Sequence, residues 1–178
     1  MDFTKFVSML ENESLFFCRT DLLGDPFEGS NSKANANFQP EVAYKDTPGF
    51  IGPAKQMRAD LSHHLKWQRQ WTFVNCWHAG EYESAAMWKL YTNSSEAVCI
   101  QSTYETLERL LRYKVRRVDA VSYVDYDTDW MPEGDILMPL LHKRKSFEHE
   151  REVRAIIYDP PWLKANGNGT CSQRKTEG

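Results

Sequence analysis

Hydrophobic residues recur at helical spacing in several parts of the chain. In residues 2–11 the apolar side chains fall every three or four positions, which predicts an amphipathic helix. The same spacing marks residues 53–69, residues 84–91 and a stretch that follows Ser102. The order Ser102-Thr103-Tyr104-Glu105 is that of a capping box, so Ser102 is predicted to cap this last helix.

Other segments are runs or alternations of apolar and β-branched residues, which is typical of strands. They are residues 14–19, 71–77, 97–100, 118–126 and 153–158. We therefore predict an α+β fold with a mixed, mostly antiparallel central sheet flanked by helices. Its single domain should span residues 1–160 with a long loop at 30–53, and residues 161–178 should form a polar, disordered tail.

Composition narrows the classes of protein to consider. The formal net charge of −3 provides no general attraction to nucleic acid or to an anionic membrane. No apolar run is long enough to span a bilayer, and the amino terminus lacks a signal-peptide pattern. Four cysteines without a CxxC pair favour reduced thiols, so we expect a cytoplasmic protein.

Dense alternating charge stands directly before the last predicted strand, where burial of charge is costly unless the groups are paired. On a strand, Glu148, Glu150, Glu152 and Arg154 would share one face; on a helix, Glu148 would neighbour Glu152 and Glu150 would neighbour Arg154. Adjacent carboxylates raise one another's proton affinity, so Glu150 and Glu148 are candidate catalytic groups. The alternative is a solvated or salt-bridged face.

Arg19 ends a predicted hydrophobic strand, which is an unusual place for a permanent cation. There it could bind a phosphate or carboxylate through two parallel hydrogen bonds, as a third candidate catalytic residue. The alternative is a structural salt bridge to Asp25, to Glu28 or to the glutamates near residue 150.

The order of Arg19, Ser102-Thr103 and Glu148-x-Glu150 resembles the R-S-E pattern of ADP-ribosyltransferases. In that class the arginine binds the phosphates of NAD, the serine holds the site together, and the glutamate stabilises the ribosyl cation. The resemblance implies NAD as a cofactor and one hollow shared by Arg19 and Glu150. Ser102-Thr103 is only part of the usual Ser-Thr-Ser, however, and Ser102 is already explained as a helix cap.

Further side chains complete the candidate ligand site. Aromatic residues make up 13% of the chain, and several could stack on a nucleobase, although core packing is the alternative. Lys143 stands in a Lys-Arg-Lys run that could bind a phosphate. His78 follows Cys76 at strand spacing, but no further ligands at metal spacing accompany them, and we expect no metal. The candidate ligand-binding residues are Trp77, His78, Trp88, Tyr91, Ser102, Lys143 and Arg154.

The ordered set of segments resembles the prokaryotic domain of unknown function 2971 family over roughly residues 2–158. The resemblance rests on Ser14–Arg19, Asp25–Gly29, Trp71–His78, Glu83–Tyr91, Ile100–Thr103, Val121–Tyr126 and Lys143–Arg154. Members continue beyond the position of Tyr158, which implies that this chain lacks a C-terminal portion.

Two functions remain open after this reasoning. The first is an enzyme or degenerate enzyme with a nucleotide-type ligand, which requires Arg19 and Glu150 in one cleft. The second is a non-catalytic recognition module for a protein or ligand, in which the loop at 30–53 and the aromatic residues contact the partner. It requires Arg19 paired with a structural carboxylate, no enclosed pocket and an exposed apolar patch. The oligomeric state is left open.

Overall fold

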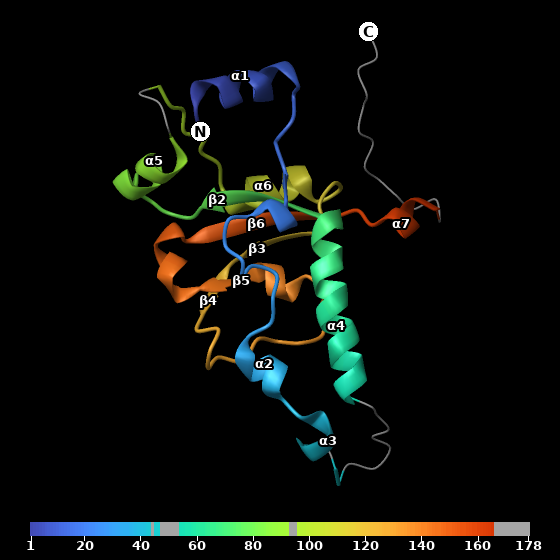
Figure 1. Cartoon of the computed structure of the whole chain (residues 1–178). Coiled ribbons are helices and arrows are strands. Elements are labelled where there is room, and N and C mark those ends of the chain that lie inside the picture. Colours follow the sequence, from blue (N-terminus) through green and yellow to red (C-terminus); the bar gives the residue numbers. More distant parts are fainter. Residues whose placement is uncertain (44, 47–53, 93–95, 166–178) are drawn as a thin grey trace.

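The computed structural model describes residues 1–43, 45–46, 54–92 and 96–165 (Figure 1). Its main sheet has four antiparallel strands in the order β1-β2-β6-β3. These strands are β1 (Cys18–Arg19), β2 (Thr72–His78), β6 (Glu152–Tyr158) and β3 (Arg117–Ala120). A parallel pair, β4 (Ser122–Val124) with β5 (His142–Arg144), lies beside the sheet. The chain is thus a single α+β domain with a mostly antiparallel sheet, as predicted.

Helices surround the sheet (Figure 1). The α-helices are α1 (Phe3–Glu11), α2 (Lys33–Asn37), α3 (Pro40–Ala43), α4 (Ala54–Gln68), α5 (Ala85–Tyr91), α6 (Tyr104–Leu111) and α7 (Pro161–Ala165). The described residues also form four 3-10 helices, which are η1 (Thr20–Leu22), η2 (Arg69–Trp71), η3 (Met138–Leu141) and η4 (Lys145–Glu150). None of the described helices is both long enough and apolar enough to cross a membrane.

The core lies on one face of the sheet because strand side chains alternate between faces. Val74 of β2 pairs with Ile156 of β6, and both are almost fully buried. They pack against Leu137, Leu140 and Leu141 from the segment around η3. On this same face, the first half of β6 carries the charged residues Glu152 and Arg154 where the second half carries Ile156. These charged residues belong to the candidate site.

Three strand predictions needed correction. Residues 97–100 form no strand; Ala97 makes only an isolated bridge to Asp2. The predicted strand at 118–126 divides into β3 and β4, which lie in different sheets. The first strand is shorter than predicted, at Cys18–Arg19. In each case apolar character was present, but strand pairing depends on a partner that a local pattern does not identify.

The loop, cap and tail predictions also changed. The loop predicted at residues 30–53 contains α2 and α3, while residues 44 and 47–53 lie outside the described part. Thr103 is the cap of α6, because its hydroxyl accepts the Thr106 N–H at 3.2 Å. The predicted tail begins with α7, and its remainder, residues 166–178, lies outside the described residues.

Candidate functional site

Five charged side chains meet near the beginning of β6, in a group that we call the charge cluster. Its members are Glu28, Lys143, Glu150, Glu152 and Arg154. Arg154 is 1% exposed and Glu152 is 4% exposed, which is rare for charged residues unless they are paired. The cluster joins a turn near residue 28, strand β5, the end of η4 and strand β6.

Arg154 holds the centre of the charge cluster. Its Nε and Nη2 donate to the two carboxylate oxygens of Glu152 at 2.7 and 2.9 Å. Nη2 also donates to Glu28 at 2.7 Å, and Nη1 donates to the carbonyl of Leu140 at 2.7 Å. The bidentate contact with Glu152 matches the planar geometry of guanidinium and carboxylate. All three nitrogens are therefore engaged by the protein itself.

Lys143, on β5 of the small parallel sheet, also pairs with Glu28 and Glu152, and in addition with Glu150. Its Nζ lies 2.6 Å from Glu150 Oε2, and 3.3 Å from both Glu152 Oε2 and Glu28 Oε1. Arg151 makes this convergence possible, because its left-handed backbone (φ 40, ψ 56) turns the chain from η4 into β6. Glu150 and Glu152 thereby reach one ammonium group from two different elements.

The pKa shifts in the charge cluster stabilise the ionised forms. Burial alone would lower the pKa of Lys143, but the hydrogen bond to Glu150 and the charges of Glu152 and Glu28 raise it. Burial alone would raise the pKa of Glu152, but the hydrogen bond and charge of Arg154 lower it. Burial would likewise lower the pKa of Arg154, which Glu152 and Glu28 raise. The lysine thus stays an ammonium and Glu152 a carboxylate at neutral pH.

Neighbouring groups also stay in their ordinary protonation states near neutral pH. Crowding by protein atoms, followed by the charge of Glu152, raises the pKa of the Cys76 thiol, although the residue as a whole remains exposed. Partial burial, followed by the charges of Glu150 and Glu152, raises the pKa of Tyr91 to about 12. A thiol with a raised pKa is a poor nucleophile. None of these shifted groups titrates close to neutrality, where general acid–base catalysis works best.

The structure brings only some of the predicted catalytic residues together. Glu150 belongs to the charge cluster, whereas Glu148 is exposed on η4. Arg19 lies opposite Phe73, which lies opposite Ile157, so Arg19 shares the face of Ile157. The cluster residues of β6 occupy the other face. The expected hollow shared by Arg19 and Glu150 is therefore wrong, and Arg19 instead pairs with Asp21 at 2.6 Å.

The predicted ligand-binding residues are spread over several elements. Lys143 forms an ion pair with Glu150 and Arg154 forms one with Glu152. Ser102 is exposed and precedes α6. The ring of Tyr91 approaches the charge cluster closely enough to respond to its charges.

The aromatic residues of the prediction come from two different elements, β2 and α5. Trp77 Nε1 donates to Asn75, and Trp88 is half-buried on α5. His78 Nδ1 lies 2.6 Å from the carbonyl oxygen of Glu150. One described hollow is lined by Asp60, His63, His64 and Trp67. Neither this hollow nor a second one, beside Arg117, is lined by Trp77, His78, Trp88 or Tyr91.

Sequence reasoning missed the role of Glu28 and of Tyr123. Glu28 contacts Arg154 across 126 positions, and the Tyr123 hydroxyl accepts the Glu152 N–H at 2.8 Å. One signal was present: Arg154 interrupts an apolar strand, and a buried arginine requires a carboxylate. The same argument was applied to Arg19, which proves to be partly exposed.

Comparisons with family models, curated proteins and solved structures found no match to this chain. The resemblance to the domain of unknown function 2971 family therefore stays a prediction. Within the described ranges, no three or more His, Cys, Asp or Glu side chains are grouped to hold a metal ion.

Proposed function

We propose that this chain is a non-catalytic recognition module that binds a basic, apolar segment of a partner protein. The observation that carries the proposal is a set of exposed hydrophobic side chains on α1, on α5 and in the segments next to these two helices in the sequence. We call it the recognition surface, and it comprises Phe3, Leu10, Phe16, Tyr82, Leu90 and Tyr91. The exposed fractions of these residues run from 48% to 85%. Exposed apolar patches of this kind mark interaction sites in soluble proteins.

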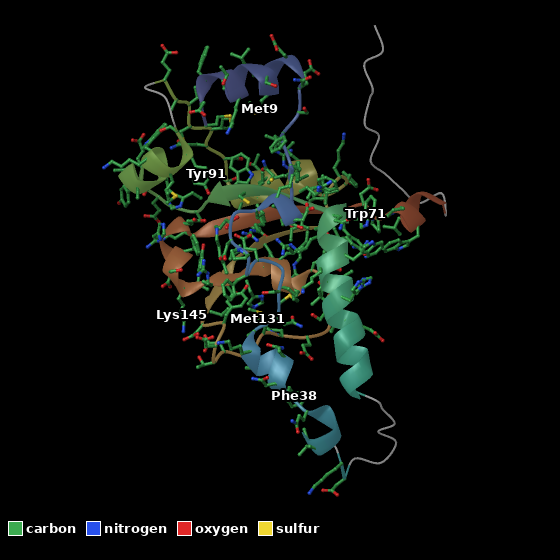
Figure 2. The ribbon with its side chains drawn as sticks, in the orientation of Figure 1. Met9, Phe38, Trp71, Tyr91, Met131 and Lys145 are labelled. Carbon is green, nitrogen blue, oxygen red and sulfur yellow. The ribbon has the colours of Figure 1, made fainter. Side chains whose placement is uncertain are left out.

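The recognition surface is built on α1 and α5, neither of which has a buried residue. In Figure 1, α1 lies above the main sheet and α5 lies to its left, and Met9 and Tyr91 mark the two helices in Figure 2. The residues at the start of α1 contact a segment that follows α5 in the sequence, because Asp2 bridges to Ala97 and the Val98 N–H donates to the Met1 carbonyl. A helix without buried side chains gains little from its own domain, since tertiary packing provides most helical stability.

Charge indicates the chemistry of the partner. In residues 1–16, 79–92 and 96–98, six carboxylates accompany two lysines and the amino terminus. The carboxylates are those of Asp2, Glu11, Glu13, Glu81, Glu83 and Glu96, and the lysines are Lys5 and Lys89. Complementary charge speeds encounter and suppresses wrong partners. A segment that carries Lys or Arg beside apolar residues fits this surface.

The nucleotide-binding enzyme is less well supported by the geometry. A phosphate at the charge cluster would have to compete with Glu150 for Lys143 and with Glu152 for Arg154. Those carboxylates already satisfy both cations in buried surroundings. The charge cluster is better explained as a structural device that joins the turn near residue 28 to β5 and β6.

The proposal is tested with two labelled short peptides, one with Leu and Lys at helical spacing and one with Glu in place of every Lys. Fluorescence anisotropy should show saturable binding of the Lys peptide only, and the affinity should fall at high salt. Phe16→Ser combined with Leu90→Ser should weaken binding by about tenfold or more, because each buried side chain is worth roughly 1.5–3 kcal/mol.

Val42→Ser is the matched control, because Val42 is 59% exposed on α3 at the other end of the fold. It should leave the affinity unchanged, and so should Glu150→Gln. Equal binding of both peptides, no binding of the Lys peptide, or an equal loss in Val42→Ser would each refute the proposal. Loss of peptide binding in Glu150→Gln with unchanged stability would return the charge cluster to the centre of function.

A further inference from the structure

A second hollow, far from the recognition surface along the chain, combines cations with open backbone. It has a volume of about 500 Å³ and is lined by Arg116, Arg117 and the segment Gly134–Leu137. Pockets for small ligands typically measure roughly 300–1,000 Å³. The hollow lies where β3 begins, at the edge of the main sheet formed by the described strands.

The two arginines of the hollow differ in how far they are already used. Arg117 donates to Asp119 at 2.8 and 3.0 Å and to Asp135 at 2.9 Å, so its charge is compensated. Arg116 is exposed, and within the described part of the chain its guanidinium makes no hydrogen bond or ion pair. Its backbone is nevertheless fixed, because the Arg116 N–H donates to the Ile156 carbonyl at 2.7 Å. A fixed backbone with an unused guanidinium is suited to bind an anion.

The backbone on the other side of the hollow adds unused donors. Among the described residues, the N–H groups of Gly134, Asp135 and Ile136 have no acceptor. Gly134 has φ +140, and no atom lies within 4 Å of where its Cβ would be. Successive free N–H groups in a turn are a recurrent anion-binding arrangement. The Asp135 carboxylate lines the same hollow, but Arg117 and the Leu137 N–H already hold it.

The surrounding sequence concentrates positive charge despite the net negative chain. Five of the nine residues from 109 to 117 are Arg or Lys, and none is acidic. Tyr113 is 75% exposed, with the Arg112 guanidinium 4.6 Å from its ring centroid. Exposed aromatic rings beside cations are features of proteins that bind bases by stacking, although Arg112 and Tyr113 are not among the residues that line the hollow.

We infer that this hollow binds the phosphate group of a small phosphorylated molecule, with Arg116 and the backbone N–H groups of residues 134–136 as donors. The inference does not depend on the recognition surface, which involves other residues. The proposed binding is noncovalent. Phosphate is favoured over a carboxylate because it offers oxygen acceptors to the guanidinium and to several N–H groups at once.

The test is a titration of the isotope-labelled protein by nuclear magnetic resonance. The probes are inorganic phosphate, ribose 5-phosphate and adenosine monophosphate. We expect saturable shifts of the Gly134–Ile136 amide signals, and an affinity about tenfold weaker in Arg116→Gln. Because Arg116 is exposed and unpaired, this variant should fold normally. Arg109→Gln removes the same charge from α6, outside the lining of the hollow, and should change the affinity less than about twofold.

The three probes also identify the source of the phosphate. Tighter binding of adenosine monophosphate than of the other two assigns a nucleotide, and equal binding of all three assigns the phosphate group alone. Either result supports the site. Absence of saturable shifts with every probe overturns it, and so does an equal loss of affinity in Arg109→Gln, which would indicate diffuse attraction to the basic segment.

Discussion

Replacement of Arg154 by methionine is the most direct test of the charge cluster. The substitution removes four hydrogen bonds of 2.7–2.9 Å, two to Glu152, one to Glu28 and one to the Leu140 carbonyl. Methionine is similar in length to the aliphatic part of arginine, so packing against the core changes little. The effect should therefore come from the charges that remain.

The size of the stability loss in Arg154→Met follows from the carboxylates that stay buried after the substitution. Glu28 and Glu152, at 3% and 4% exposure, keep Lys143, 3.3 Å from each, as their only cationic partner among the described residues. Removal of one member of a buried ion pair costs about 3–5 kcal/mol. Total stability is typically about 5–15 kcal/mol, so the variant should approach the limit of folding. Its urea midpoint should fall by roughly 2 M.

The pH dependence of the free energy of unfolding provides a second readout, because a fall in pH should have opposite effects on the native protein and on Arg154→Met. In the native chain the folded pKa of Glu152 is lowered, so its contribution to stability is present above the unfolded value of about 4.3 and is lost as pH falls through the folded value. In Arg154→Met, burial should raise the folded pKa above that of the unfolded chain. The variant should then gain stability between pH 7 and pH 5, and the gap to the native protein should narrow.

Urea titrations followed by tryptophan fluorescence at both pH values measure these quantities. Arg19→Met is the matched control, because that arginine is partly exposed and should cost no more than about 0.5 kcal/mol. A loss below about 1 kcal/mol in Arg154→Met at pH 7, or a gap that is unchanged at pH 5, would refute the reasoning.

Three further substitutions test local features by the same denaturation assay. Gly29→Ala should destabilise by about 1–3 kcal/mol, because Gly29 has φ +74 and its added Cβ would lie 2.9 Å from a Leu140 methyl group; a neutral effect would contradict this close approach. Thr103→Ala should cost about 1 kcal/mol while Ser102→Ala changes stability by less than about 0.5 kcal/mol, and the reverse order would make Ser102 the cap. Arg151→Gly should stabilise by about 0.5–1 kcal/mol, because Arg151 adopts a left-handed backbone; a loss of stability would show that its side chain contributes.

Elements with a strong local period could be predicted from the sequence. The apolar spacing in residues 2–11 indicated α1, and the alternation of residues 71–77 indicated β2. Partner choice could not be predicted in this way. The run from Val118 to Tyr126 has the composition of one strand, but its pairing with β6 ends at Ala120, and Ser122–Val124 pairs with β5 instead. Periodicity records which face is buried and carries no information about which strand lies beside it.

The candidate site shows the same division. The density of charge before an apolar strand correctly drew attention to Glu150, Glu152 and Arg154, because such charge requires partners. Glu28 could not be paired with them from the sequence, since 126 positions separate it from Arg154. The hypothesis that Arg19 and Glu150 share one hollow failed because the register between β1 and β2 decides on which face of the sheet the Arg19 side chain lies. The sequence does not show this register.

The central position of β6 has a consequence for folding during synthesis on the ribosome. β2 ends at His78, yet β6, the strand that covers its edge along all seven residues, begins only at Glu152. At a synthesis rate of about 5–20 residues per second, the nascent β2 waits for roughly 4–15 s without its partner. During that interval an apolar strand edge is open to other chains, so we expect yield in cells to depend on elongation speed and on chaperones that shield this edge.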